Sequence, residues 1–117
     1  MRVTKIGWAG SRTERYSDMV GFLEGVLGLA VTRREPDFAV LELPSGDKFE
    51  VFGPSDRDHQ HFTTGPVVGF AVEDLPAAVA ELEQAGVALL GAGDDEKAGS
   101  WRHFRAPDGN VYELSTG

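Results

Sequence analysis

The sequence lacks cysteine and is short of basic residues: it has 11 Lys and Arg against 19 Asp and Glu, a formal net charge of −8. Without cysteine there is no disulfide framework, no thiolate metal site and no thiol nucleophile. The basic residues are scattered, and Arg33 and Arg34 are the only adjacent pair. Because an acidic surface without a segregated basic patch repels a phosphate backbone, we expect no nucleic-acid partner.

Long apolar segments are also lacking. The first ten residues contain no apolar core of signal-peptide length, and no stretch reaches the roughly 20 apolar residues of a membrane span. We therefore expect a cytoplasmic protein without a membrane partner. The length of 117 residues and the hydrophobic content of 41% are typical of one globular domain, and 15 Gly with 6 Pro predict many short elements joined by tight turns.

An internal repeat organises the chain. The segment PSGDKFEV at 44–51 reappears as PDGNVYEL at 107–114, and each copy reads as a turn followed by a strand. Glu50 and Glu113 occupy equivalent positions in the two copies. Since aromatic and aliphatic neighbours flank each Glu and belong to the opposite face of the strand, we expect both carboxylates on the face turned away from the helices.

The two halves also share an order of elements. An apolar stripe at 19–27 predicts a helix stopped by Gly28, and a second stripe at 75–82 predicts a helix capped by Asp74 and ended at Gly86. Strands are expected around each helix, at 3–9, 29–33, 38–43 and through Glu50 in the first half, and at 66–72, 87–90, 101–105 and through Glu113 in the second. Each half therefore reads β-α-β-β-β.

This order predicts an α+β fold with one domain, 1–117. It consists of a first module at 1–53, a polar linker at 54–65 and a second module at 66–117, which pack as one unit because neither half sheet can hide both its faces alone. His59 and His61 fall in the linker, where we expect a solvated loop.

The repeat resembles the vicinal oxygen chelate superfamily, which contains glyoxalase I, bleomycin-resistance proteins and extradiol dioxygenases. The resemblance is carried by FLEGVLGL at 22–29, GFAVEDLPAAVAELEQAGV at 69–87 and PDGNVYEL at 107–114. It implies two tandem βαβββ modules that form a cup-shaped mixed sheet (the glyoxalase/bleomycin resistance fold), with a ligand cavity on the concave face and helices on the convex side. It also implies a homodimer, because sheet edges and the cup's rim commonly close against a second subunit.

The resemblance further implies where a metal would be bound. Metal-using members take one ligand from the first strand and one from the end of each module, and Glu50 and Glu113 match the two end positions. The first-strand positions hold Val67 and either Gly7 or Trp8, which are not metal ligands. Half of the ligand set is therefore missing, so no cofactor is certain, and a divalent metal held by Glu50 and Glu113 is the alternative.

Our first hypothesis is a small-molecule-binding protein similar to bleomycin-resistance proteins. Two carboxylates in one cavity favour a cationic ligand, and the Trp8 indole can stack on a planar or cationic group. The expected ligand-binding residues are Trp8, Glu50, Phe52, Val67, Gly69, Trp101, His103 and Glu113. The alternative is a metal-dependent lyase, isomerase or thiol transferase in which Glu50 or Glu113 is the general base, with the metal site completed by His103, a linker His or a partner subunit.

Two local questions stay open in the sequence. An odd number of loop residues between the last two strands puts His103 beside Glu113, whereas an even number puts Phe104 there. A structural alternative is that Arg102 or Arg105 pairs with the carboxylates in an internal salt bridge.

Overall fold

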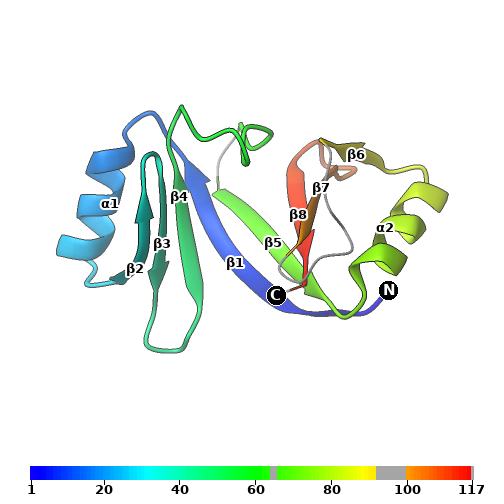
Figure 1. The fold of residues 1–117 in the computed structure, drawn as a ribbon, viewed down its shortest axis with the longest axis horizontal. Helices are drawn as coiled ribbons and strands as arrows, with labels where there is room; N and C mark the ends of the chain where they lie inside the picture. Colours follow the sequence, from blue (N-terminus) through cyan, green and yellow to red (C-terminus); the bar gives the residue numbers. More distant parts are fainter. Residues whose placement is uncertain (64–65, 92–99, 117) are drawn as a thin grey trace. The chain divides into compact units, whose positions relative to one another are not determined.

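The computed structural model describes residues 1–63, 66–91 and 100–116, so the last two residues of the predicted linker lie outside the described residues (Figure 1). The elements follow the predicted β-α-β-β-β order in each half. They are β1 (Val3–Arg12), α1 (Tyr16–Gly25), β2 (Ala30–Glu35), β3 (Phe38–Glu42), β4 (Lys48–Phe52), β5 (Pro66–Val72), α2 (Leu75–Gln84), β6 (Ala88–Leu90), β7 (Trp101–Arg105) and β8 (Val111–Ser115). Neither described helix is long and apolar enough to cross a membrane.

The predicted α+β class is confirmed by one mixed sheet with the strand order β2-β3-β4-β1-β5-β8-β7-β6. β1 pairs with β4, and β5 with β8, in parallel, and the other registered pairs are antiparallel. The chain forms two compact units: the α1 unit, Trp8–Val67, and the α2 unit, Met1–Gly7 with Val68–Gly117. β1 contributes to both units, and the module boundaries expected at 53 and 66 stay a prediction.

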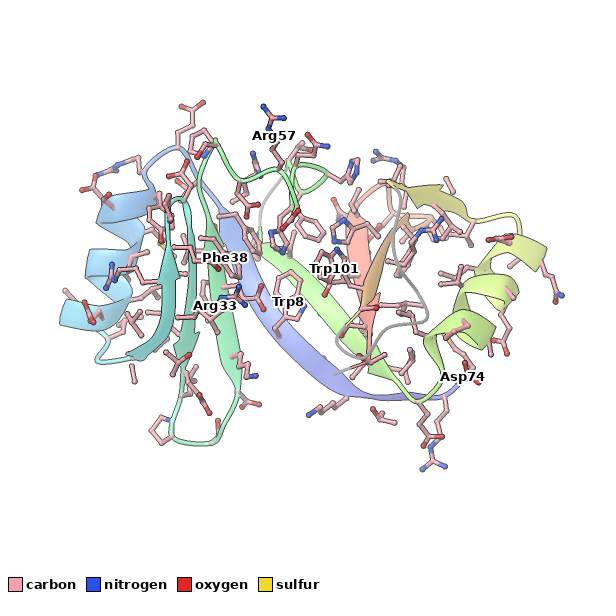
Figure 2. The ribbon with its side chains drawn as sticks, viewed as in Figure 1. Trp8, Arg33, Phe38, Arg57, Asp74 and Trp101 are labelled. Carbon is pink, nitrogen blue, oxygen red and sulfur yellow. The ribbon has the colours of Figure 1, made fainter. Side chains whose placement is uncertain are left out.

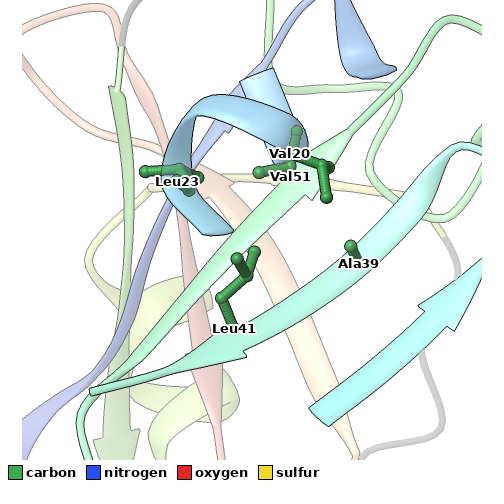
Figure 3. Close-up of a cluster of buried hydrophobic side chains, with 5 residues drawn as sticks. All are labelled: Val20, Leu23, Ala39, Leu41 and Val51. Atoms are coloured by element: carbon green, nitrogen blue, oxygen red, sulfur yellow. The ribbon is translucent and has the colours of Figure 1, made fainter. Parts of the chain in front are cut away.

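One face of the α1 unit is covered by α1. Its Val20 and Leu23 are buried against side chains of β3 and β4, as Figure 3 shows; the strand residues in this cluster are Ala39, Leu41 and Val51. Because successive side chains alternate across a strand, Val51 on the helix side places Glu50 and Phe52 on the opposite face. In each unit we call the face of the sheet that no described helix covers the helix-free face. The face expected for Glu50 is therefore the observed one.

The stripe expected at 19–27 is only partly correct. Val20 and Leu23 are buried, but Phe22, Val26 and Leu27 are exposed. The helix ends at Gly25, earlier than the predicted stop, so the last two of these residues leave the helical phase. The Leu29 backbone N–H then donates to the Leu23 carbonyl at 3.0 Å, a closure that Gly28 permits with φ at 75°.

The α2 unit follows the sequence expectation more closely. The Asp74 carboxylate accepts a hydrogen bond from the Ala77 backbone N–H at 3.0 Å, which is the predicted cap. The buried cluster beneath the helix comprises Val72, Leu75, Ala78, Val79 and Leu114. Since Leu114 faces α2, its neighbour Glu113 faces away from it.

A five-residue connection, 106–110, joins β7 to β8 and decides the register. Its ends are closed by the Ala106 N–H, which donates to the Asn110 carbonyl at 2.9 Å. The odd count pairs His103 with Glu113, and Phe104 packs against the α2 cluster. His103 is therefore the residue beside Glu113.

Candidate functional site

The helix-free face of the α2 unit carries a buried pair of ionisable side chains. His103 Nε2 lies 3.0 Å from Glu113 Oε1. The two residues are only 3% and 5% exposed. When Glu113 is ionised, the shared proton belongs to His103 Nε2, which then donates to the carboxylate. The hydrogen bond fixes the orientation of both side chains in a buried environment.

Two more residues of this face frame the pair. Trp101 lies two residues before His103 on β7, so it shares the face, and it is 39% exposed. Figure 2 shows its side chain on the side of β7 away from α2. Gly69 of β5 is the register partner of Glu113 and adds no side chain above it. An indole, an imidazole and a carboxylate thus follow one another along this face.

The arginines near the pair point elsewhere. Arg102 is the register partner of Leu114 and so belongs to the α2 side of the sheet. Arg105 Nη1 donates to the Gly109 carbonyl at 2.8 Å, within the turn that follows β7. The side chain that stands beside Glu113 is therefore an imidazole and not a guanidinium, which differs from the salt-bridge alternative raised by the sequence.

The same turn is braced from β8. The Tyr112 hydroxyl donates to Asp108 Oδ2 at 2.6 Å, and this bond, with that from the Asn110 backbone N–H, holds the pKa of the Asp108 carboxyl below its usual value. The turn that sets the His103–Glu113 register therefore has its own polar anchor.

The helix-free face of the α1 unit differs in character. Glu50 is half-buried there, in register with Gly10 of β1 and Val40 of β3. Beyond it the face is aromatic: Trp8 is 7% exposed and meets Phe52 edge-on, with ring centroids 5.7 Å apart. Phe38 lies on the same side, away from α1 (Figure 2).

The expectation of a solvated loop is wrong for His59. The residue is 9% exposed, and its ring stacks on Phe52 with centroids 4.0 Å apart. Its Nδ1 lies 2.7 Å from Asp56 Oδ2. The polar composition of 54–65 concealed this arrangement, and the one available signal was the apolar Phe62 inside that segment.

The family is decided by comparison with known proteins. The model of the Glyoxalase/Bleomycin resistance protein/Dioxygenase superfamily matches residues 5–114. The chain belongs to this superfamily. The resemblance in the repeat is thereby confirmed, whereas a search of curated proteins finds no match.

Solved structures agree with the superfamily fold. Methylmalonyl-CoA epimerase from Mycobacterium tuberculosis is 20% identical, with 97% of this chain and 87% of that chain covered and a TM-score of 0.73. The Streptomyces coelicolor epimerase, in complex with 2-nitronate-propionyl-CoA, is 19% identical, with 97% of both chains covered and a TM-score of 0.70. A superfamily member from Vibrio splendidus 12B01 is 17% identical, with coverage of 92% and 95% and a TM-score of 0.68. At these identities the likeness shows the fold alone.

The donor set does not fit a complete metal centre of the superfamily. Val67 is buried and apolar, and Trp8 is packed among aromatic rings. Over 1–63, 66–91 and 100–116, no group of three or more His, Asp or Glu side chains is placed to hold a metal ion. His103 and Glu113 supply two adjacent donors, whereas a catalytic zinc site needs three protein ligands.

The structure therefore sorts the expected ligand-binding residues into two groups. Gly69, Trp101, His103 and Glu113 lie together on the helix-free face of the α2 unit. Trp8, Glu50 and Phe52 lie on the helix-free face of the α1 unit, and Val67 is buried near the start of β5. Contact of any of them with a ligand stays a prediction.

The buried pair makes a quantitative prediction. In a double-mutant cycle of His103→Ala and Glu113→Ala, we expect a coupling free energy of about 0.5–3 kcal/mol, because the two side chains are in direct contact. Urea unfolding measures it. The exposed pair Arg15 and Asp18, 3.1 Å apart, is the control and should couple more weakly. A His103–Glu113 coupling free energy no larger than that of the control pair would contradict the direct contact between the two buried side chains.

Proposed function

We propose that this chain is a small-molecule-binding member of its superfamily whose ligand is a compact cationic amine carrying an aromatic ring. The observation that supports this is the buried Glu113–His103 pair with Trp101 beside it. A positive charge stabilises a buried carboxylate further, so an ammonium group complements Glu113 beside its hydrogen bond to His103. The exposed indole offers a π face for the ring or for the cation itself.

The spacing of these side chains limits the size of the ligand. Diagonal neighbours on paired antiparallel strands lie about 7–8 Å apart, which is the relation of Trp101 to Glu113. An arylalkylamine with a short linker places a ring on the indole and its nitrogen at the carboxylate. Gly69, the register partner of Glu113, places no side chain beyond its α-carbon next to the carboxylate.

The charge of the whole chain acts in the same direction. A net charge of −8 attracts a cation over a long range and speeds its encounter with the protein, an effect that weakens as salt rises. The homodimer expected from the resemblance belongs to this proposal as well. It is supported by the strand order, in which β2 and β6 stand at the two ends and each pairs with one neighbouring strand among the described residues.

Calorimetry with phenethylamine tests the proposal. We expect phenethylamine to bind and its neutral analogue 2-phenylethanol to bind far more weakly, since only the amine carries a positive charge to the Glu113 carboxylate. Glu113→Gln should weaken amine binding at least tenfold, about 1.4 kcal/mol. Glu83→Gln removes an exposed carboxylate at α2 and should change nothing. Equal binding of both compounds, or no binding of phenethylamine, would refute the proposal.

The contact between His103 and Glu113 favours one second candidate, a divalent-metal-dependent lyase, isomerase or thiol transferase. The two side chains would supply adjacent nitrogen and oxygen donors, with further ligands from outside this pair. A bound divalent ion would supply a positive charge that stabilises a developing oxyanion. The binding proposal is preferred because the described residues hold no third donor beside the pair.

Metal analysis separates the two candidates. Protein purified without chelator and dialysed against Mg²⁺, Mn²⁺, Co²⁺, Ni²⁺ or Zn²⁺ should retain less than about a tenth of an equivalent of any of them, because two donors are too few for tight binding. Stoichiometric metal that is lost in both His103→Ala and Glu113→Ala would instead overturn the preference for the binding proposal and favour the enzyme candidate.

A further inference from the structure

The segment after β4 covers the aromatic part of the helix-free face of the α1 unit. We name this segment, residues 53–62, the strap. His59 stands at its centre, and its ring contacts rings from β1, β3, β4 and the strap itself. The ring partners of His59, with centroid distances of 4.0 to 6.4 Å, are Phe52, Phe38, Phe62 and Trp8.

His59 makes the contacts that an aromatic ligand would make. Its ring lies nearly parallel to Phe52, at 14°, and to Phe38, at 11°. Trp8 closes the arrangement edge-on, at 83°. Parallel stacking on two rings with a third at the edge is a favourable geometry for a flat heteroaromatic ring.

Arg12 fastens the strap to β1. Its Nη1 donates to the carbonyls of Asp56 at 3.2 Å and His59 at 3.1 Å, and its Nη2 donates to the Pro54 carbonyl at 3.2 Å. One guanidinium therefore organises three backbone acceptors across the strap. Because Arg12 is the last residue of β1, these hydrogen bonds hold the strap against the strand that carries Trp8.

Asp37 fastens the beginning of the strap to the β2–β3 turn. Its Oδ2 accepts from the Ser55 hydroxyl at 2.6 Å and the Ser55 backbone N–H at 2.7 Å, and these bonds hold the pKa of the Asp37 carboxyl below its usual value. Gly53 lies so close that a Cβ atom there would come within 2.4 Å of Asp37 Cγ. The strap therefore starts from a fixed point.

Asp56 orients the imidazole itself. Its Oδ2 is hydrogen-bonded to His59 Nδ1 at 2.7 Å, while its Oδ1 accepts a hydrogen bond from the Asp58 backbone N–H at 3.0 Å. The carboxylate thus sets the ring plane that stacks on Phe52, as carboxylates orient imidazoles elsewhere.

We propose that His59 is a built-in occupant of this aromatic face, and that it determines specificity by holding the place of a ligand ring there. Trp8 and Phe52, both expected to contact ligand, are then committed to the chain's own imidazole. Ligand is left to the face that carries Trp101 and Glu113. The statement about ligand rests on the proposed function, whereas the statement that His59 occupies the face does not.

The two tryptophans allow a direct test, since the chain has no others. In the Trp101→Phe protein the emission comes from Trp8 alone, and we expect acrylamide to quench it weakly. Adding His59→Ala should raise the quenching constant severalfold, because the ring that shields Trp8 is gone. Gln60→Ala, an exposed neighbour on the same strap, is the matched control and should leave quenching unchanged.

Free imidazole supplies the decisive arm. At millimolar concentration it should restore the shielding of Trp8 in the Trp101→Phe, His59→Ala protein, and it should have no effect in the Gln60→Ala control. If His59→Ala does not fold, Asp56→Ala keeps the ring but releases its orientation, and Trp8 quenching should rise there instead. Strong quenching of Trp8 with the strap intact, or unchanged quenching in folded His59→Ala, would overturn the proposal.

Phenethylamine distinguishes the two proposals. It should change the emission of Trp101 in the Trp8→Phe protein and leave that of Trp8 unchanged in the Trp101→Phe protein. A response from Trp8 would refute confinement of the ligand. If neither tryptophan responds, the proposed function fails, and the quenching and imidazole results still decide whether His59 is the occupant.

Discussion

The five-residue connection between β7 and β8 determines what stands beside Glu113. With an odd number of residues the strands pair His103 with Glu113, and the imidazole reaches the carboxylate at 3.0 Å. One residue fewer would turn the histidine toward α2 and bring Phe104 next to the carboxylate. The hydrogen bond from Tyr112 of β8 to Asp108 of the connection helps to hold this register. It therefore influences which side chain stands beside Glu113, although neither Tyr112 nor Asp108 belongs to the helix-free face.

A duplicated scaffold supports two different faces. Each half places a glutamate at the same strand position and a helix on the opposite side, and this follows from the repeat. The two halves differ in where their histidines lie. In the α2 unit, His103 lies on β7 and Trp101 of the same strand is exposed, whereas in the α1 unit His59 lies in the segment after β4 and is stacked against Phe52.

Much of the fold could be predicted because its determinants are local. The Asp74 cap, the bounds of β5 and β7 and the alternation around Glu50 and Glu113 depend on residues adjacent in the chain. The superfamily was also within reach, since its motifs occur in order over nearly the whole length.

The parts that the sequence did not predict depend on contacts between distant residues, on where a helix ends, or on the number of residues in a connection. The burial of His59 requires Phe38 and Trp8, which are distant in the chain, to meet at one place. An apolar stripe does not mark where a helix stops, so the end of α1 at Gly25 was not predicted. Val26 and Leu27 lie beyond this end and are exposed. Whether the β7–β8 connection has an odd or an even number of residues decides between two registers, and the composition of this segment does not indicate which one forms.

The central claim is that His103 and Glu113 form the ligand-contacting pair while His59 is committed to the interior. The imidazole signals of the three histidines in proton–nitrogen correlation spectra report on it directly, with His103→Gln and His59→Gln used for assignment. On addition of phenethylamine, the account predicts that the His103 ring signals shift and those of His59 stay in place. Movement of the His59 signals with His103 unchanged would contradict it.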